Sequence, residues 1–128
     1  MIYLDSCLLV HLVESRTRAD VVRARTHAVE GAHVAVPPLV VLECRVGPFR
    51  SEDEGLRPRC ARVLDPRTVL TRGITVCERA ARLRATHRLG TPDARHLAAA
   101  LEHGCDELWT NDDRLSRAVG DFARVVGR

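Results

Sequence analysis

The sequence predicts an α/β protein with a mainly parallel sheet, because short apolar runs alternate with helical segments along most of the chain. Turn and helix-start residues separate these runs, which are the length of strands. At 128 residues the chain has the length of one domain with one hydrophobic core, so we expect a single domain over residues 1–128. The expected strands cover residues 2–4, 33–36, 69–70, 107–109 and 123–126.

Helix signals in the first half of the chain fill the gaps between these strands. Ser6 stands where the N-cap of the first helix is expected. A second helix is expected over residues 18–30, ahead of a glycine stop. Two prolines then introduce a third helix over residues 39–46, which we expect to end before Gly47-Pro48.

The second half begins with a segment that is harder to assign. Residues 49–59 are polar and contain Gly55 and Pro58, which break a continuous helix, so we expect a short helix to resume only at residues 59–64. Thr75 is the expected N-cap of a helix that reaches about residue 87.

The clearest helix start is Thr91-Pro92-Asp93, which reads as an N-cap, a first-position proline and a first-turn acid. Apolar residues follow at core spacing until Gly104, the expected stop. A brief helix is expected over residues 114–119.

The charge composition allows a nucleic-acid partner without demanding one. All 20 basic residues are arginine, which grips phosphate in a bidentate fork, but a lysine-free chain is also what codon bias in a GC-rich genome produces. Aromatic residues make up only 3% of the chain, too few for the stacking platforms of common RNA-binding modules. Any RNA contact is therefore expected to use arginine and the backbone.

Cysteines and targeting signals point to the cytoplasm. The five cysteines are scattered and never form Cys-x-x-Cys, which argues against a disulfide framework or a zinc ribbon and favours small buried side chains. No apolar run could span a bilayer, and the first residues lack the features of a signal peptide. We expect a cytoplasmic protein with no membrane contact.

Four acids, Asp5, Glu43, Asp93 and Asp112, fall where apolar runs pass into turns or helix starts. Each has a structural explanation: Asp5 and Asp112 suit turns or N-caps, Asp93 suits a first helical turn, and Glu43 suits a solvent-facing helix position. Glu43 is nevertheless flanked by apolar residues, where a carboxylate needs a partner.

Convergence of these acids would create a metal site, since parallel strands gather their carboxyl ends at one edge of a sheet. Several carboxylates close together either raise their pKa values or enclose a divalent cation. Oxygen ligands favour Mg²⁺ or Mn²⁺, which would activate water for phosphodiester hydrolysis without a protein nucleophile.

Other carboxylate chemistries fit the sequence less well. A response-regulator receiver needs a strand-terminal lysine, and a phosphatase of the haloacid dehalogenase type needs an aspartate where Cys7 stands. A P-loop nucleotide hydrolase needs a Gly-Lys phosphate loop, and the chain has no lysine.

Together these motifs resemble the PIN-domain ribonucleases, most closely the toxins of VapBC toxin-antitoxin pairs. The resemblance covers nearly the whole chain, with residues 49–59 as its unusual stretch. It rests on Ile2-Tyr3-Leu4-Asp5-Ser6, Glu43 on a helix after Val36-Pro37, Thr91-Pro92-Asp93-Ala94 with His96-Leu97-Ala98-Ala99-Ala100, and Thr110-Asn111-Asp112 with Leu115.

The resemblance implies a three-layer α/β/α sandwich that cleaves RNA with water activated by Mg²⁺ or Mn²⁺. It makes Asp5, Glu43, Asp93 and Asp112 the metal-binding and catalytic acids, and gives the hydroxyls of Ser6 and Thr110 a supporting role. Asp113 lies outside the motif, and we expect it to face solvent or cap a helix.

The same resemblance implies a homodimer that a cognate antitoxin silences. The alternative is a PIN-like module that binds RNA or protein without cleaving; the presence of all four acids favours the enzyme.

Overall fold

The structure is a computed structural model that describes residues 1–14, 16–27, 33–65, 67–71 and 73–126. Within this part of the chain, five strands form one sheet in the order β3-β2-β1-β4-β5, and every neighbouring pair is parallel. The strands are β1 (Ile2–Leu4), β2 (Val34–Val36), β3 (Thr68–Val69), β4 (Glu107–Thr110) and β5 (Ala123–Val125). The predicted mainly parallel α/β architecture is confirmed.

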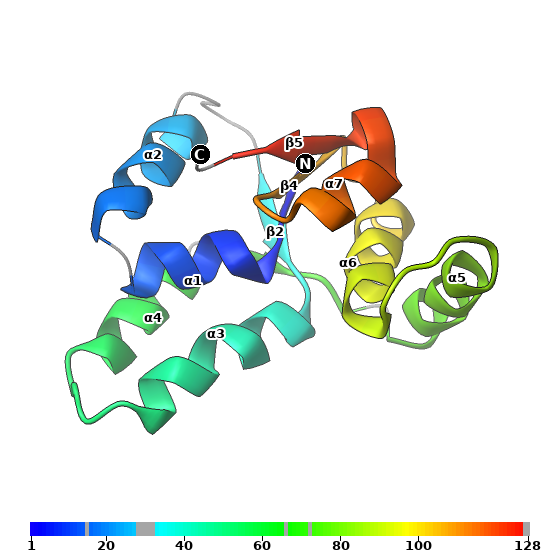
Figure 1. The fold of residues 1–128 in the computed structure, drawn as a ribbon. Helices are drawn as coiled ribbons and strands as arrows, with labels where there is room; N and C mark the ends of the chain where they lie inside the picture. The colour runs from blue at the N-terminus through cyan, green and yellow to red at the C-terminus, as the bar shows by residue number, and fades with distance from the viewer. Residues whose placement is uncertain (15, 28–32, 66, 72, 127–128) are drawn as a thin grey trace.

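Helices connect the strands and cover both faces of the sheet (Figure 1). Crossovers of this kind are what parallel pairing requires. The helices are α1 (Ser6–Glu14), α2 (Arg16–His27), α3 (Pro38–Arg50), α4 (Leu56–Leu64), α5 (Gly73–Thr86), α6 (Thr91–Glu102) and α7 (Asp113–Val119), with a 3₁₀ turn, η1 (Gly120–Phe122).

Two apolar clusters, one on each side of the sheet, hold the layers together. Alternation along β1 sends Ile2 and Leu4 into the cluster under α1 to α4, and Tyr3 into the cluster under α5 and α6. Figure 1 shows these two groups of helices on opposite sides of the sheet. The predicted α/β/α layering follows from this division.

The main correction concerns α3, which continues through Gly47 and Pro48 instead of stopping before them. A proline inside a helix removes one N–H and leaves the carbonyl four residues earlier without its donor. Here that carbonyl belongs to Cys44, and the Cys60 thiol of α4 donates to it at 3.5 Å. Pro48 is itself buried, so packing against α4 favours the helical path despite the lost bond.

Other helix starts lie earlier than predicted. Helix α4 begins at Leu56, which puts Pro58 in its first turn, where the missing N–H costs little. Helix α5 begins at Gly73, so Thr75 is not its cap. Helix α1 includes Ser6, and the N-cap of α6 is Gly90.

Some predictions at helix ends are confirmed and others lie outside the description. Gly104 follows α6 with φ +62°, the left-handed conformation expected of a glycine stop. Helix α2 begins two residues before the predicted start, and the predicted end near Gly31 falls among residues that are not described. Among the described residues, no helix has both the length and the apolar character needed to cross a membrane.

The burial of Leu8 on α1 gives a prediction about stability. Leu8 is fully buried in the core, whereas Leu42 on α3 is 60% exposed. Leu8→Ala should lower the free energy of unfolding by about 3 kcal/mol, because it leaves a cavity under the sheet. Leu42→Ala, the same change at the surface, should shift it by less than about 0.5 kcal/mol. Urea unfolding of both variants measures the difference, and equal losses would contradict the assigned core.

Candidate active site

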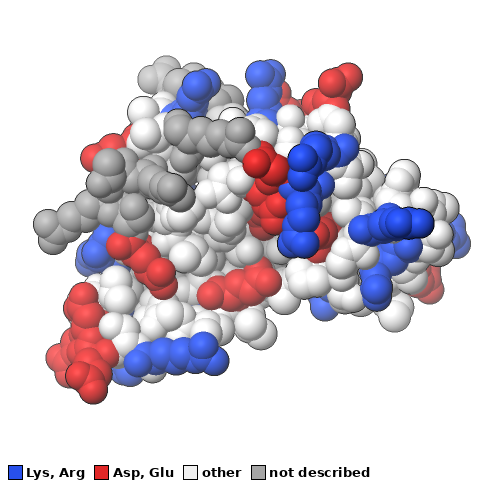
Figure 2. Space-filling view, viewed as in Figure 1, with Lys and Arg blue, Asp and Glu red and all other residues white. Residues whose placement is uncertain are grey.

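The four predicted acids come from different elements that meet at the carboxyl edge of the sheet. Asp5 directly follows β1 and Asp112 follows β4, while Glu43 lies on α3 and Asp93 in the first turn of α6. Strands β1 and β4 are paired neighbours, and the Asp5 N–H extends their ladder by donating to the Trp109 carbonyl at 3.0 Å. Figure 2 shows acidic side chains gathered near the middle of this face, beside basic ones.

Asp5 is the most deeply placed of the four, at 5% exposure. Its Oδ2 accepts from the Thr110 hydroxyl at 2.7 Å and from the Cys7 thiol at 3.1 Å. Its Oδ1 accepts from the Ser6 hydroxyl at 3.3 Å. A buried carboxylate requires such donors. Both hydroxyls predicted to support the site, those of Ser6 and Thr110, therefore contact Asp5.

Asp112 is the N-cap of α7. Its Oδ1 accepts from the backbone N–H groups of Arg114 at 2.7 Å and Leu115 at 3.4 Å. Its own N–H donates to Thr110 Oγ1 at 2.9 Å, so one hydroxyl links Asp112 to Asp5. The capping explanation considered for Asp112 is correct, and it orients the carboxylate at the strand end. Asp113 is exposed, as predicted.

Glu43 reaches the same place from α3, and it is not the solvent-facing helix residue of the alternative explanation. Its side chain is 30% exposed, and Oε2 is enclosed without a hydrogen bond in the described structure. The imidazole of His96, 3.5 Å from Oε2, and the hydroxyl of Ser6 hold the pKa of Glu43 below its usual value despite burial. An enclosed oxygen with an unused lone pair is free to take a cation.

Asp93 responds to the other acids. Burial raises the pKa of Asp93, and the negative charges of Asp112 and Asp5 raise it further, against the opposing effect of Arg114. The direction of this shift is the one expected when carboxylates lie near one another. Direct contacts link the other three acids: the Thr110 hydroxyl bridges Asp5 and Asp112, and His96 Nε2 lies 3.5 Å from both Asp5 and Glu43.

His96 is a member of the site that the sequence did not single out. The side chain is 2% exposed, and Nε2 lies 3.5 Å from both Asp5 Oδ1 and Glu43 Oε2. On the other side of the ring, Nδ1 lies 2.8 Å from the Tyr3 hydroxyl. His96 follows Asp93 by three residues on α6, so the two share a helix face, and this spacing was the available signal.

Cys7 is in contact with the site but is unsuited to be a nucleophile. Burial and the charge of Asp5 raise the pKa of the Cys7 thiol to about 12, so the sulfur keeps its proton at neutral pH. It serves as a donor to Asp5 and accepts the Asn111 N–H at 3.4 Å.

The donor set fits a hard divalent cation better than zinc. Carboxylates offer only oxygen ligands, burial and neighbouring charges raise the pKa of Asp93, and Oε2 of Glu43 makes no hydrogen bond in the described structure. As they stand, no three His, Cys, Asp or Glu side chains of the described chain are arranged to hold a metal ion.

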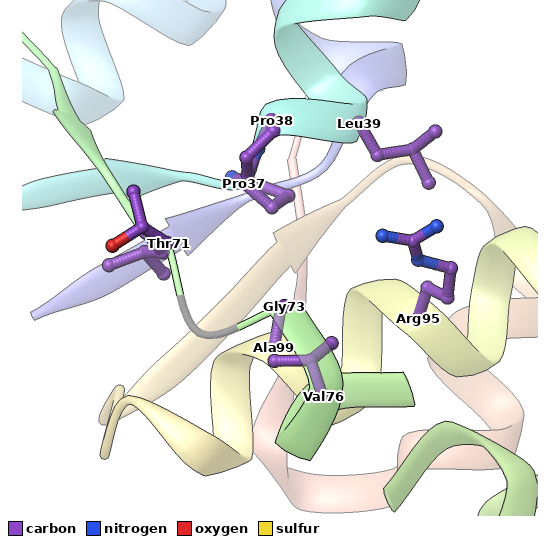
Figure 3. A pocket seen from close by; sticks show the side chains of 9 residues that line it. Pro37, Pro38, Leu39, Thr71, Gly73, Val76, Arg95 and Ala99 are labelled. Atoms are coloured by element: carbon purple, nitrogen blue, oxygen red, sulfur yellow. The ribbon is translucent and has the colours of Figure 1, made fainter. Parts of the chain in front are cut away.

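One hollow of the described structure contacts an acid of the site and another does not. The first, of about 230 Å³, is lined by Asp93 together with Arg88, before α6, and Arg114 of α7. The second is apolar, about 50 Å³, and lies between the starts of α3 and α5 and the side of α6. Figure 3 shows the Arg95 side chain beside Leu39 at this second hollow, which contains none of the four acids.

The fold and this edge of acids define the class of protein. A PIN domain family model matches residues 2–120, so the chain belongs to the PIN domain family. The comparison with curated proteins finds no match.

Three solved structures share the fold at low sequence identity. A toxin-antitoxin complex from Klebsiella pneumoniae is 22% identical with a TM-score of 0.76, covering 97% of this chain and 96% of that one. VapBC2 from Rickettsia felis, bound to a DNA fragment from their promoter, is 16% identical with a TM-score of 0.84, covering 98% and 99%. FitAcB from Neisseria gonorrhoeae is 19% identical with a TM-score of 0.72, covering 98% and 96%.

The Thr110 hydroxyl gives the first prediction at this site. Thr110→Val keeps the shape but removes the shortest bond to Asp5 and the acceptor of the Asp112 N–H. We expect the free energy of unfolding to fall by about 2–3 kcal/mol, because a charged group and an N–H lose partners inside the protein. Thr110→Ser keeps the hydroxyl and should cost only about 1 kcal/mol. A serine variant as unstable as the valine variant in urea would contradict this assignment.

The raised pKa of Asp93 gives a prediction about pH. A carboxyl whose pKa is higher in the folded than in the unfolded protein destabilises the fold above that range. Without metal, Asp93→Asn should therefore raise the melting temperature at pH 7. The gain should be roughly 1–3 °C, because the charge also interacts favourably with the start of α6.

The pH dependence of this gain checks the cause. As pH falls through the raised pKa of the folded state and then below 3.8, the ordinary pKa of aspartate, the carboxyl becomes neutral in both states, and the difference in melting temperature should shrink. Thermal melts in EDTA across this range measure it. A lower melting temperature for Asp93→Asn at pH 7 would show that the neighbouring charges do not strain this site.

Proposed function

We propose that this protein is a metal-dependent endoribonuclease, the toxin of a type II toxin-antitoxin pair, which hydrolyses RNA phosphodiester bonds. The observation that carries the proposal is that Asp5 and Asp112 share the Thr110 hydroxyl at one sheet edge, while His96 Nε2 lies 3.5 Å from both Asp5 and an enclosed Glu43 oxygen that makes no hydrogen bond in the described structure. Membership of the PIN domain family supports the same reaction.

In this proposal Asp5, Glu43, Asp93 and Asp112 hold Mg²⁺, or Mn²⁺ in its place. The ion, when bound, lowers the pKa of a water and neutralises charge on the phosphate. The protein supplies rigid carboxylates for it. Asp5 is fixed by the Thr110 hydroxyl, and Asp112 is fixed by its capping bonds to α7. Fixed ligands need little rearrangement when substrate arrives.

Charge around the acids suits a nucleic-acid strand. The hollow beside Asp93 is walled by Arg88 and Arg114, and guanidinium groups bind phosphate oxygens in a bidentate geometry. A strand whose scissile phosphate lies at the acids would bring a neighbouring phosphate toward this hollow. Arginine would thus bind the RNA backbone here, whereas other RNA-binding domains stack bases on aromatic side chains.

The partners follow from the similar structures. Two of them are described as a toxin-antitoxin complex and as VapBC2 with promoter DNA, which supports a cognate antitoxin for this chain. We also propose a cytoplasmic homodimer, as toxins of this class form. A single domain over residues 1–128 would carry the whole activity.

RNA cleavage by purified protein, freed of any partner, tests the proposal. Wild-type protein should cleave RNA when Mg²⁺ or Mn²⁺ is present, and EDTA should abolish this cleavage. Asp5→Asn should reduce cleavage by at least about 100-fold, because the neutral amide of asparagine lacks the negative charge that would bind the ion. Mn²⁺ should also raise the melting temperature of wild type and leave that of Asp5→Asn unchanged.

Asp113→Asn is the matched control, since it removes the same charge from an exposed neighbour of Asp112. Its cleavage should stay within about twofold of wild type. Wild-type protein that binds RNA but shows no metal-dependent cleavage would support the alternative, a PIN-like binding module. Cleavage that survives Asp5→Asn would overturn the assigned site.

A further inference from the structure

Tyr3 and His96 form a buried pair that no step of the proposed reaction uses. We propose that they are positioning residues: the Tyr3 hydroxyl holds the His96 ring so that its Nε2–H lies between the carboxylates of Asp5 and Glu43. This inference rests on the proposed function, because it assigns the pair to the metal-binding acids.

The fold places the pair next to two of the acids, Asp5 and Asp93. Strand alternation puts Tyr3 on the same side of the sheet as Asp5, two residues later. Helical spacing puts His96 on the same side of α6 as Asp93, three residues earlier. The pair therefore joins a central strand to the helix that carries another of the four acids.

The surroundings determine which ring nitrogen carries hydrogen. Nε2 lies 3.5 Å from Asp5 Oδ1 and 3.5 Å from Glu43 Oε2, and a lone pair there would face two carboxylate oxygens. Nε2 therefore carries hydrogen. In a neutral ring Nδ1 is then an acceptor, and the Tyr3 hydroxyl 2.8 Å away donates to it. In a charged ring the direction of that bond reverses, but Nε2–H stays between the acids.

Packing makes the ring orientation unique. Tyr3 is fully buried and His96 is 2% exposed, and their rings meet edge to face with centroids 6.0 Å apart. Burial and the charge of Asp5 hold the pKa of Tyr3 well above its usual value, so the phenol keeps its proton. With Nδ1 occupied by Tyr3, the imidazole cannot flip without leaving Nδ1 or Nε2 unpaired inside the protein.

The contacts to the acids are long, and this is consistent with positioning. At 3.5 Å, Nε2 attracts both carboxylates but makes a strong hydrogen bond to neither, and Glu43 Oε2 keeps its lone pairs for a cation. Groups that orient metal-binding side chains in this way change metal affinity by about 10–100-fold when removed.

The position of the hydrogen is tested first, because it does not depend on metal. In protein labelled with ¹⁵N-histidine, the His96 signals are identified by their loss in His96→Gln. We expect a protonated Nε2 in wild-type protein. In Tyr3→Phe, which keeps the ring and removes the hydroxyl, the Nδ1 signal should shift. An unprotonated Nε2, or an Nδ1 signal that ignores Tyr3→Phe, would overturn the inference.

Metal affinity is tested next, by titrating Mn²⁺ and measuring the free ion by electron paramagnetic resonance. Tyr3→Phe should weaken Mn²⁺ binding on the order of 10-fold. His96→Leu should weaken it at least as much, and His96→Gln should recover part of the loss because its amide offers an N–H at a similar reach. Val76→Ala is the control, since it thins the same buried cluster from α5, which carries none of the four acids.

The outcomes separate a positioning role from a structural one. We expect Val76→Ala to lower the melting temperature while leaving Mn²⁺ affinity within about twofold of wild type, since α5 carries none of the four acids. Variants of Tyr3 and His96 that lose stability but bind Mn²⁺ like wild type would show that the pair is only core packing. Wild-type protein that binds no Mn²⁺ would defeat the proposed function, and the inference with it, whatever the ¹⁵N spectrum shows.

Discussion

The hydrogen bond between Thr110 and Asp5 is the interaction on which the site depends. Asp5 carries a charge at 5% exposure, and such a group needs donors from the protein. The 2.7 Å bond from Thr110 is available only because β1 and β4 are parallel neighbours whose carboxyl ends coincide. Since the same hydroxyl accepts the Asp112 N–H, the pairing that builds the centre of the sheet also fixes two of the acids.

The other two acids, Glu43 and Asp93, lie on helices, and their electrostatic environments differ. Glu43 has its pKa lowered by a buried imidazole, while Asp93 has its pKa raised by burial and by neighbouring carboxylates. These opposite shifts have different causes, because His96 stabilises the charge of Glu43 while burial and neighbouring carboxylates disfavour the charge of Asp93. A divalent cation of the kind proposed above would offset the negative charge around Asp93.

The parallel sheet and the placement of Asp5 and Asp112 at the carboxyl ends of strands were predictable because both follow from local signals. Apolar runs that end in Asp5 or just before Asp112 already place these residues at the edge of a parallel sheet. The path of α3 through Pro48 was not predictable, because the donor that replaces the missing one is Cys60 of the next helix. His96 was missed for the same reason: its role depends on Tyr3 and Glu43, which lie far from it in sequence.

The carboxylate of Asp112 therefore both stabilises the start of α7 and belongs to the candidate site. Oδ1 of Asp112 caps α7 by accepting from the N–H groups of Arg114 and Leu115, and these bonds fix the carboxylate just beyond the end of β4. Removing the acid would affect both the helix start and the site, whereas Asp93 has no comparable side-chain bond and carries the electrostatic strain. Strain of this kind persists where a site is kept ready for a ligand that the folded chain alone does not supply. The bonds of Asp112 thus contribute to the fold itself, whereas the charge of Asp93 is disfavoured by burial and has no side-chain hydrogen bond in the described structure.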